Sequence, residues 1–233
     1  MIITYLEHSG FTIETDSKVL VFDYYQDPQH VVDVYAHTAK ETKKPLWFFV
    51  SHIHEDHFNK DIVRFKDVTA QYIYNADVPF LAPDAAKDHP MKVYETNAID
   101  DVTVMEYGST DEGGSFLVKT DGLRIFHAGD LNWWHWLGDT DENNEVAKEN
   151  FVREMKHLDG KTFDVVFFPV DARLEGAREW GVSAFLNQVN VTKCLIPMHY
   201  FGTPWQPTAE FKAKHGNVPL WIPTQPGDST TVD

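Results

Sequence analysis

The chain has 233 residues, of which 42% are hydrophobic and 14% aromatic, so it can bury a sizeable core, and we expect one domain over residues 1–233. Its net charge of -16, from 36 acidic and 20 basic residues, repels a phosphate backbone, so nucleic acid is not an expected partner. The single cysteine, Cys194, excludes an intramolecular disulfide framework and a thiolate cluster for zinc, and we expect it to pack in the core.

The beginning of the chain lacks the basic and apolar regions of a secretory signal. No apolar run approaches the roughly 20 residues needed to cross a bilayer. We therefore expect a protein of the reducing cytoplasm with no membrane association.

The first half of the chain is expected to start with sheet. Alternating apolar and polar residues predict an antiparallel meander with strands at 2–7, 11–15 and 19–25. A helix is predicted over 31–44, closed by Pro45, and the apolar run LWFFV at 46–50 is typical of a strand covered on both faces. A short helix at 60–66, with Asn59 as its N-cap, and a strand at 70–74 are expected next.

The second half alternates strands and helices. Strands are expected at 92–96, 102–107, 115–120 and 123–127, and Asp121-Gly122 is a strong hairpin signal between the last two. The longest amphipathic helix is expected at 142–158, followed by strand 164–170, helix 183–189, strand 193–198 and helix 208–216. Two strand-rich halves, each followed by helices, predict an α/β (α+β by some schemes) four-layer αββα sandwich of two mixed β-sheets with outer helices.

Three histidines and two carboxylates directly follow the 46–50 strand, in the stretch SHIHEDHFN at 51–59. In an extended segment, residues two apart point the same way, so His52 and His54 should present their rings to one point while Ile53 faces the core. Asp56 and His57 should turn toward a second point nearby, which suits a pair of metal ions. Imidazole and carboxylate ligands favour zinc, manganese or iron.

Two further apolar strands end in candidate ligands. The segment LRIFHAGD places His127 and Asp130 beside a glycine turn, and CLIPMHYFG places His199 in the same situation. Strand ends on one side of a sandwich converge on a common edge, so we expect these side chains to join the histidine cluster. Asp130 has two oxygens and is the natural bridge between two metals, with His199 as a terminal ligand.

The order H-x-H-x-D-H, then G-D, then a late histidine resembles the metallo-β-lactamase superfamily over nearly the whole chain. In finer detail, LEHSGFTIET, IFHAGD and IPMHY look like the branch of the ascorbate-6-phosphate lactonase and related metal-dependent hydrolases. The resemblance implies a ligand set of His52 and His54 for a first ion, Asp56 and His57 for a second, Asp130 as the bridge and His199 completing the second site.

One loop departs from the family pattern. The superfamily usually supplies a third histidine to the first ion from the loop before the Asp130 strand, and here that loop, EYGSTDEGGSFLV at 106–118, contains none. Candidates to replace this ligand or to orient the others are His127, His135, Asp111 and His8. For His127 we favour a hydrogen bond that fixes Asp130.

Four more residues are candidate substrate contacts. Trp133 and Trp134 follow Asp130 and suit either a substrate pocket or a buried wall. Arg173 suits either a bidentate contact to a substrate anion or an ordinary ion pair with Asp171. Tyr200, next to His199, suits either proton donation to an oxyanion or packing.

These features predict a metal-dependent hydrolase, of lactonase or phosphoesterase type, that uses a metal-bound hydroxide on a small ester, lactone or phosphoester. We expect one or two divalent ions (Zn, Mn or Fe) and a small-molecule substrate, with an anionic one as a candidate. Asp56 or Asp130 would orient the water and accept its proton. The alternative is a degenerate, non-catalytic metal- or ligand-binding member of the fold, and a nuclease or a diiron redox enzyme is less favoured. A homo-oligomer is a reasonable expectation.

Overall fold

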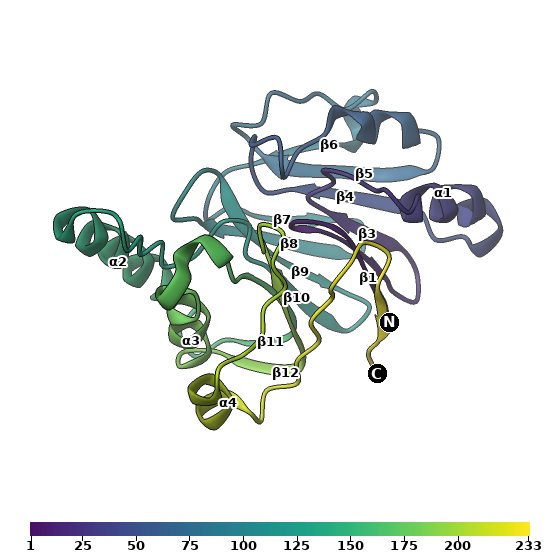
Figure 1. Cartoon of the computed structure of the whole chain (residues 1–233). Helices are drawn as coiled ribbons and strands as arrows, with labels where there is room; N and C mark the ends of the chain where they lie inside the picture. Colours follow the sequence, from purple (N-terminus) through teal and green to yellow (C-terminus); the bar gives the residue numbers. More distant parts are fainter. The chain divides into compact units, whose positions relative to one another are not determined.

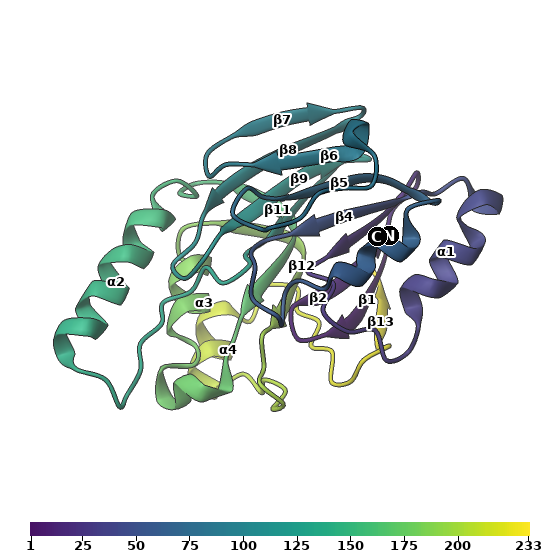
Figure 2. The ribbon, with the colours of Figure 1, turned by 90° about the horizontal axis from the view of Figure 1, so that it is seen from above.

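The computed structural model describes all 233 residues, which form two compact units: Met1–Glu95 with Pro223–Asp233, and Thr96–Ile222. Each unit is built on one mixed β-sheet (Figures 1 and 2). No helix combines the length and the apolar character that a membrane span requires.

The first unit contains a seven-stranded sheet in the order β13-β1-β2-β3-β4-β5-β6. Its strands are β1 (Ile2–Glu7), β2 (Gly10–Glu14), β3 (Val19–Phe22), β4 (Leu46–Val50), β5 (Thr69–Asn75), β6 (Asp88–Met91) and β13 (Ser229–Thr231). Pairing is antiparallel from β13 to β3 and parallel from β3 to β6. The predicted meander at the start of the chain is therefore confirmed, and the two chain ends meet where the Met1 amine donates to the Val232 carbonyl at 2.9 Å.

The helices of the first unit are α1 (Val31–Thr42) and the short 3-10 helices η1 (Lys60–Phe65) and η2 (Ala85–Lys87). Figure 1 shows α1 beside β4. An aromatic cluster fills one face of the sheet, with the Phe48 ring 5.8 Å from Phe65 and 5.7 Å from Tyr72. This packing fixes β4, whose end carries the histidine motif.

The second unit contains a six-stranded sheet in the order β12-β11-β10-β9-β8-β7. Its strands are β7 (Thr96–Ile99), β8 (Val102–Gly108), β9 (Gly114–Thr120), β10 (Leu123–His127), β11 (Thr162–Pro169) and β12 (Asn190–Met198). Strands β7 to β10 pair antiparallel, and β10, β11 and β12 pair parallel. The carboxyl ends of these three parallel strands share one edge of the sheet, which is where Asp130 and His199 follow.

The helices of the second unit are α2 (Asp141–Met155), η3 (Ala172–Ala177), α3 (Trp180–Leu186) and α4 (Ala209–His215). Both ribbon views show α3 and α4 together near β11 and β12 (Figures 1 and 2). Phe185 of α3 stacks 5.8 Å from Phe126 of β10, so the helix covers this part of the sheet with an aromatic contact. Cys194 is 4% exposed and packs in the core as predicted.

The short helix expected at 60–66 is present as the 3-10 helix Lys60–Phe65, and Asn59 caps it as predicted by accepting from Asp61 N. Two other local expectations are wrong. Residues 92–95 form a turn rather than a strand, because Glu95 N donates to Lys92 O and the Glu95 carboxylate accepts from Lys92 N. Ile53 is 41% exposed and does not face the core, because the chain leaves the sheet after Val50 and the strand period no longer applies.

The predicted hairpin between β9 and β10 is confirmed. Asp121 and Gly122 have φ values of 48° and 75°, the left-handed backbone that a tight two-residue turn requires. This turn sets the register that brings the end of β10 to the edge of the sheet.

Candidate metal centre

The histidine motif forms a tight turn at the end of β4 in the first unit. The N–H groups of His57 and Phe58 both donate to the His54 carbonyl at 2.9 Å, which folds the chain back on itself. His52 Nε2 and His54 Nδ1 lie 3.0 Å apart, so these two rings converge on one point. Asp56 and His57 are carried to the other side of the turn.

A buried carboxylate, Asp23 at the end of β3, anchors this turn. It is 1% exposed and accepts from Ser51 N at 2.8 Å, from Ser51 Oγ at 2.6 Å and from His57 Nδ1 at 2.7 Å. Ser51 Oγ donates its single proton to Asp23, so it accepts from His52 Nδ1 at 2.9 Å. The rings of His52 and His57 therefore carry their proton on Nδ1 and present the lone pair of Nε2.

His8 joins the Asp56 side of the turn. It follows β1 with a left-handed φ of 56°, held by a hydrogen bond from its N–H to Tyr5 Oη at 2.8 Å. Its Nε2 lies 3.1 Å from Asp56 Oδ2. The hydrogen bond from His8, joined by the nearby His57 ring, holds the pKa of Asp56 well below its usual range, although partial burial opposes this.

The candidate ligand atoms of His8, Asp56 and His57 all lie within 4.8 Å of one another. The structure therefore places His8, which the sequence offered as a substitute ligand or orienting residue, beside Asp56 and His57. A group of two imidazole nitrogens and one carboxylate at this separation suits zinc, manganese or iron.

In the second unit, the shared edge of β10, β11 and β12 brings together Asp130, Asp171 and His199. His199 Nε2 lies 3.5 Å from Asp130 Oδ1, and His199 Nδ1 lies 3.0 Å from Asp171 Oδ2. His199 has a left-handed φ of 60°, which turns its ring back toward the strand ends. Asp130 and His199, which follow two of these strands, therefore lie close together within this unit.

Asp171, which the sequence indicated only as an ion-pair partner of Arg173, also contacts His199, and Asp23 was not singled out from the sequence at all. Asp171 is fully buried, and its carboxylate accepts from His199 and from Arg173 Nη2 at 2.6 Å. Burial alone would raise the pKa of Asp171, but these hydrogen bonds outweigh it and lower the pKa to about 2. An ionised Asp171 fixes the proton of His199 on Nδ1 and leaves Nε2 as the metal-binding atom.

The loop that lacks the usual histidine is tied to the Asp130 turn by Thr110. Its hydroxyl donates to Asn132 O at 2.6 Å and accepts from Asn132 N at 2.9 Å. Asp111 in the same loop is exposed, and its N–H donates to Ser109 Oγ at 3.3 Å. The loop therefore supports the backbone after Asp130 through a hydroxyl.

The two histidines near Asp130 have other contacts. His127 is fully buried, accepts from Gly129 N at 3.2 Å and packs 5.6 Å from the Phe167 ring. Its bond to Gly129 braces the turn that carries Asp130. The His135 ring lies 4.5 Å from Trp180. Neither histidine, nor Asp111, belongs to a group of three candidate ligand atoms within 4.8 Å.

Aromatic side chains surround His199 and Arg173. Trp134 donates from Nε1 to Asp130 O at 3.0 Å, and its ring lies 5.5 Å from the His199 ring. The Arg173 guanidinium lies 3.4 Å from the Phe201 ring centroid. Tyr200, between His199 and Phe201, is 4% exposed and packed.

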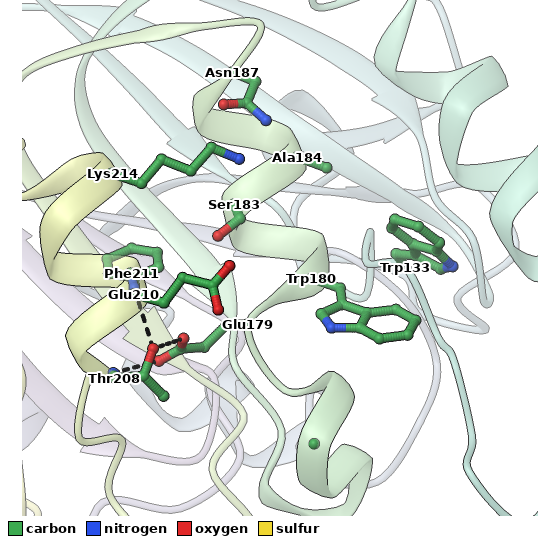
Figure 3. Close-up of a pocket in the computed structure, with 11 residues that line it drawn as sticks. Trp133, Glu179, Trp180, Ser183, Ala184, Asn187, Thr208, Glu210, Phe211 and Lys214 are labelled. Atoms are coloured by element: carbon green, nitrogen blue, oxygen red, sulfur yellow. Dashed lines mark hydrogen bonds between the residues drawn. The ribbon is translucent and has the colours of Figure 1, made fainter.

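Trp133 contributes to a different cavity of the second unit. This cavity of about 390 Å³ lies against α3 and α4, and Figure 3 shows Trp133 and Trp180 on one side of it and Lys214 on the other. The Trp133 ring lies 5.4 Å from Trp180. The adjacent tryptophans 133 and 134 therefore have different surroundings, and Trp134 is the one beside His199.

The donor set fits a divalent metal ion. Asp23 and Asp171 bond His57 and His199 through Nδ1, the arrangement that carboxylates adopt around metal-binding histidines. Proteins place such buried carboxylates where a ring must keep one tautomer. Asp171 shares with Asp130 the signal of a carboxylate shortly after a predicted buried strand, whereas Asp23 fell inside the strand expected at 19–25 and gave no such signal.

The sequence is similar to those of known proteins of one metal-dependent superfamily. A family model described as the beta-lactamase superfamily domain matches residues 2–199. The chain is 25% identical to a UPF0173 metal-dependent hydrolase of Pelotomaculum thermopropionicum, with 91% of each chain covered. It is also 25% identical to a protein of the same description from Thermococcus kodakarensis, with 97% of each covered.

Solved structures share the fold. Igni18, a metallo hydrolase from Ignicoccus hospitalis, matches with a TM-score of 0.62 and 17% identity, over 98% of this chain and 97% of that one. The metallo-β-lactamase fold protein YhfI of Bacillus subtilis matches with a TM-score of 0.60 and 10% identity, over 98% of both chains. These likenesses confirm the predicted fold class of two mixed β-sheets flanked by helices.

Proposed function

The chain belongs to the metallo-β-lactamase superfamily, and we propose that it is a metal-dependent hydrolase of a small ester, lactone or phosphoester. The observation that carries the proposal is the anchoring of His57 and His199 through Nδ1 by the buried carboxylates Asp23 and Asp171. Relatives described as metal-dependent hydrolases, which match over more than nine-tenths of the chain, support it. The family model spans both compact units, which supports our prediction of one domain over residues 1–233.

We assign the metal ligands as the family resemblance implies: His52, His54, Asp56, His57, Asp130 and His199. Zinc, manganese and iron all suit imidazole and carboxylate donors, and one or two ions are proposed. When bound, such an ion supplies Lewis acidity and makes water a nucleophile near neutral pH. The chain places His8 beside this set as an additional candidate through its contact with Asp56.

The carboxylates Asp56 and Asp130 are the proposed acid–base groups. The hydrogen bond from His8 lowers the pKa of Asp56, so Asp56 is ionised at neutral pH and can accept a hydrogen bond from water, although the lowered pKa makes it a weaker base. Asp130 is 3% exposed, and Trp134 Nε1 donates to its backbone carbonyl, which holds the backbone of this residue in place. In our proposal both carboxylates orient the attacking water.

An anionic substrate is our finer proposal. Arg173 uses Nε and Nη2 for Asp171, which leaves Nη1 for a substrate carboxylate or phosphate. Its guanidinium is packed against Phe201 and lies 5.3 Å from the Trp136 ring centroid, so little side-chain entropy remains to be lost on binding. The resemblance to the lactonase branch makes a phosphorylated lactone the first substrate class to assay.

A non-catalytic member of the fold is the second candidate. The resemblance implies that Gly108, Ser109 or Thr110 stands roughly where the superfamily usually places a third histidine, and the Thr110 hydroxyl is committed to Asn132. A first site held by two rings binds its ion more weakly than one held by three. Metal content without turnover would favour this candidate.

The test combines metal analysis with an activity panel. Protein purified without added metal is analysed for bound ions, and lactones, phosphodiesters and phosphomonoesters are assayed with Mn, Zn and Fe. Asp130→Asn should abolish both metal retention and turnover, whereas the exposed turn substitution Asp159→Asn should preserve both. Equal turnover by Asp130→Asn and the wild type on every substrate would refute the catalytic proposal.

A further inference from the structure

A second cavity of the second unit, of about 410 Å³, has a lining unlike the rest of this acidic chain. Its volume lies within the range of roughly 300 to 1,000 Å³ that small-molecule sites occupy. Alternate residues of β8 and β9 form much of its wall, and the start of β11 completes it. Its charged and apolar lining residues are Lys119, Arg124, Lys161, Met105, Leu117 and Phe163.

The charge of this cavity is opposite to that of the chain. Three of its lining residues are basic and none is acidic, whereas the whole chain has 36 acidic and 20 basic residues. Only Arg124 has a carboxylate partner, Asp164, with Nε–Oδ2 at 3.1 Å and Nη2–Oδ1 at 3.2 Å. Lys119 and Lys161 form no ion pair, so the cavity holds two unbalanced ammonium groups.

The three basic side chains of this cavity lie close enough to repel one another. Lys119 of β9 and Arg124 of β10 are direct partners in the antiparallel register, and like charges opposite each other destabilise a strand pair. Lys161 reaches the same cavity with its Nζ 5.7 Å from the Tyr107 ring centroid. A bound anion would relieve this repulsion.

The floor of the cavity is apolar. Leu117 is 6% and Phe163 1% exposed, and Tyr107 and Met105 lie on the same face of β8. The cavity therefore offers a buried hydrophobic floor below a cationic rim, in which Lys119 is exposed and Arg124 and Lys161 are half-buried. Such a lining matches a ligand with an apolar body and one negative group.

We propose that this cavity binds a small carboxylate with an aromatic or aliphatic body. The carboxylate lies between the ammonium groups of Lys119 and Lys161, and the apolar body lies over Leu117 and Phe163. The site is independent of the metal ligands and of the proposed hydrolase activity.

Phenylacetate is a suitable probe because phenylacetamide is its neutral match and acetate lacks its apolar body. Binding to the full chain is measured by calorimetry and by amide chemical shifts, with a chelator present so that no carboxylate can coordinate a metal. We expect phenylacetate to bind about tenfold more tightly than either control, with affinity falling as salt is added. The amide shifts should map to β8, β9 and the start of β11.

The double substitution Lys119→Gln/Lys161→Gln should weaken phenylacetate binding about tenfold. The matched double substitution of exposed lysines, Lys66→Gln/Lys212→Gln, should leave it unchanged. Equal affinity in both variants, or shifts confined to other strands, would overturn the proposal. A dimer that covers this face, excludes phenylacetate and dissociates on Lys119→Gln/Lys161→Gln would also overturn it.

Discussion

Asp23 is predicted to control metal affinity without contacting the metal. Its carboxylate accepts three hydrogen bonds, two from Ser51 and one from His57, at 2.6 to 2.8 Å. In Asp23→Asn, an amide nitrogen replaces one oxygen, so at least one of these donors loses its acceptor and the remaining bonds lose their assistance from charge.

The magnitude follows from the number and kind of bonds. A hydrogen bond to a charged group contributes about 1.5 to 3 kcal/mol, so we expect the unfolding free energy of the metal-free protein to fall by about that amount. Without an ionised partner on Nδ1, His57 is a weaker base and is less strictly held in one tautomer. We therefore expect zinc affinity to fall by about 10- to 100-fold.

Two measurements separate these effects. Urea unfolding of metal-stripped protein gives the change in stability, and competition with a chromophoric chelator gives the change in zinc affinity. Asp16→Asn, an exposed turn substitution, is the matched control and should change neither quantity. Zinc affinity of Asp23→Asn indistinguishable from wild type, with His57 still protonated on Nδ1 by nitrogen NMR, would refute the anchoring argument.

Three further predictions concern stability. Partial burial would raise the pKa of Asp164, but hydrogen bonds from Arg124 and Thr192 outweigh it and lower the pKa. These bonds therefore stabilise the fold above the unfolded pKa near 3.9, and this effect is lost as the pH falls through the folded pKa. Asp164→Asn should cost about 1 kcal/mol in urea unfolding at pH 7 and nothing in strong acid, and an equal cost at both pH values would contradict this. Gly181→Ala should lower the unfolding free energy by about 1 to 3 kcal/mol, because the added Cβ would collide with Oδ1 of the fully buried Asn132. An unchanged urea midpoint would show that the site can relax. Removing metal with a chelator should lower the unfolding free energy by about 2.7 kcal/mol, if the free metal concentration had been 100 times the dissociation constant. Adding the metal back should restore the melting temperature. A melting temperature that does not respond to the chelator would argue against bound metal.

Local sequence patterns predicted most of the strands and helices but failed at one short turn and at a strand that forms by pairing with a distant segment. The apolar run at 46–50 is β4 to the residue, because a fully buried strand needs apolar side chains on both faces. The segment at 92–96 has strand-forming residues, but the bond between Lys92 and Glu95 turns the chain there. Strand β13 was not predicted, since it exists through pairing with β1 at the opposite end of the sequence.

Some residues of the candidate site were predictable from local sequence, and others were not. His52, His54, Asp56 and His57 were evident because they are close in sequence and follow a buried strand. The approach of His8 to Asp56 depends on a contact across 48 positions of the numbering, which no local pattern encodes. His8 was a candidate only through the family resemblance.

By itself, the sequence determined which strands are buried and which metal-binding side chains follow them, because burial and strand period are properties of neighbouring residues. Only the tertiary structure decided which carboxylates hold the rings of His57 and His199, because Asp23 and Asp171 meet them 34 and 28 residues away along the chain. In the basic cavity, the predicted hairpin already made Lys119 and Arg124 neighbours, but Lys161 joins them only when β11 pairs with β10. Strand pairing between distant segments, rather than composition, fixes the chemistry of both places.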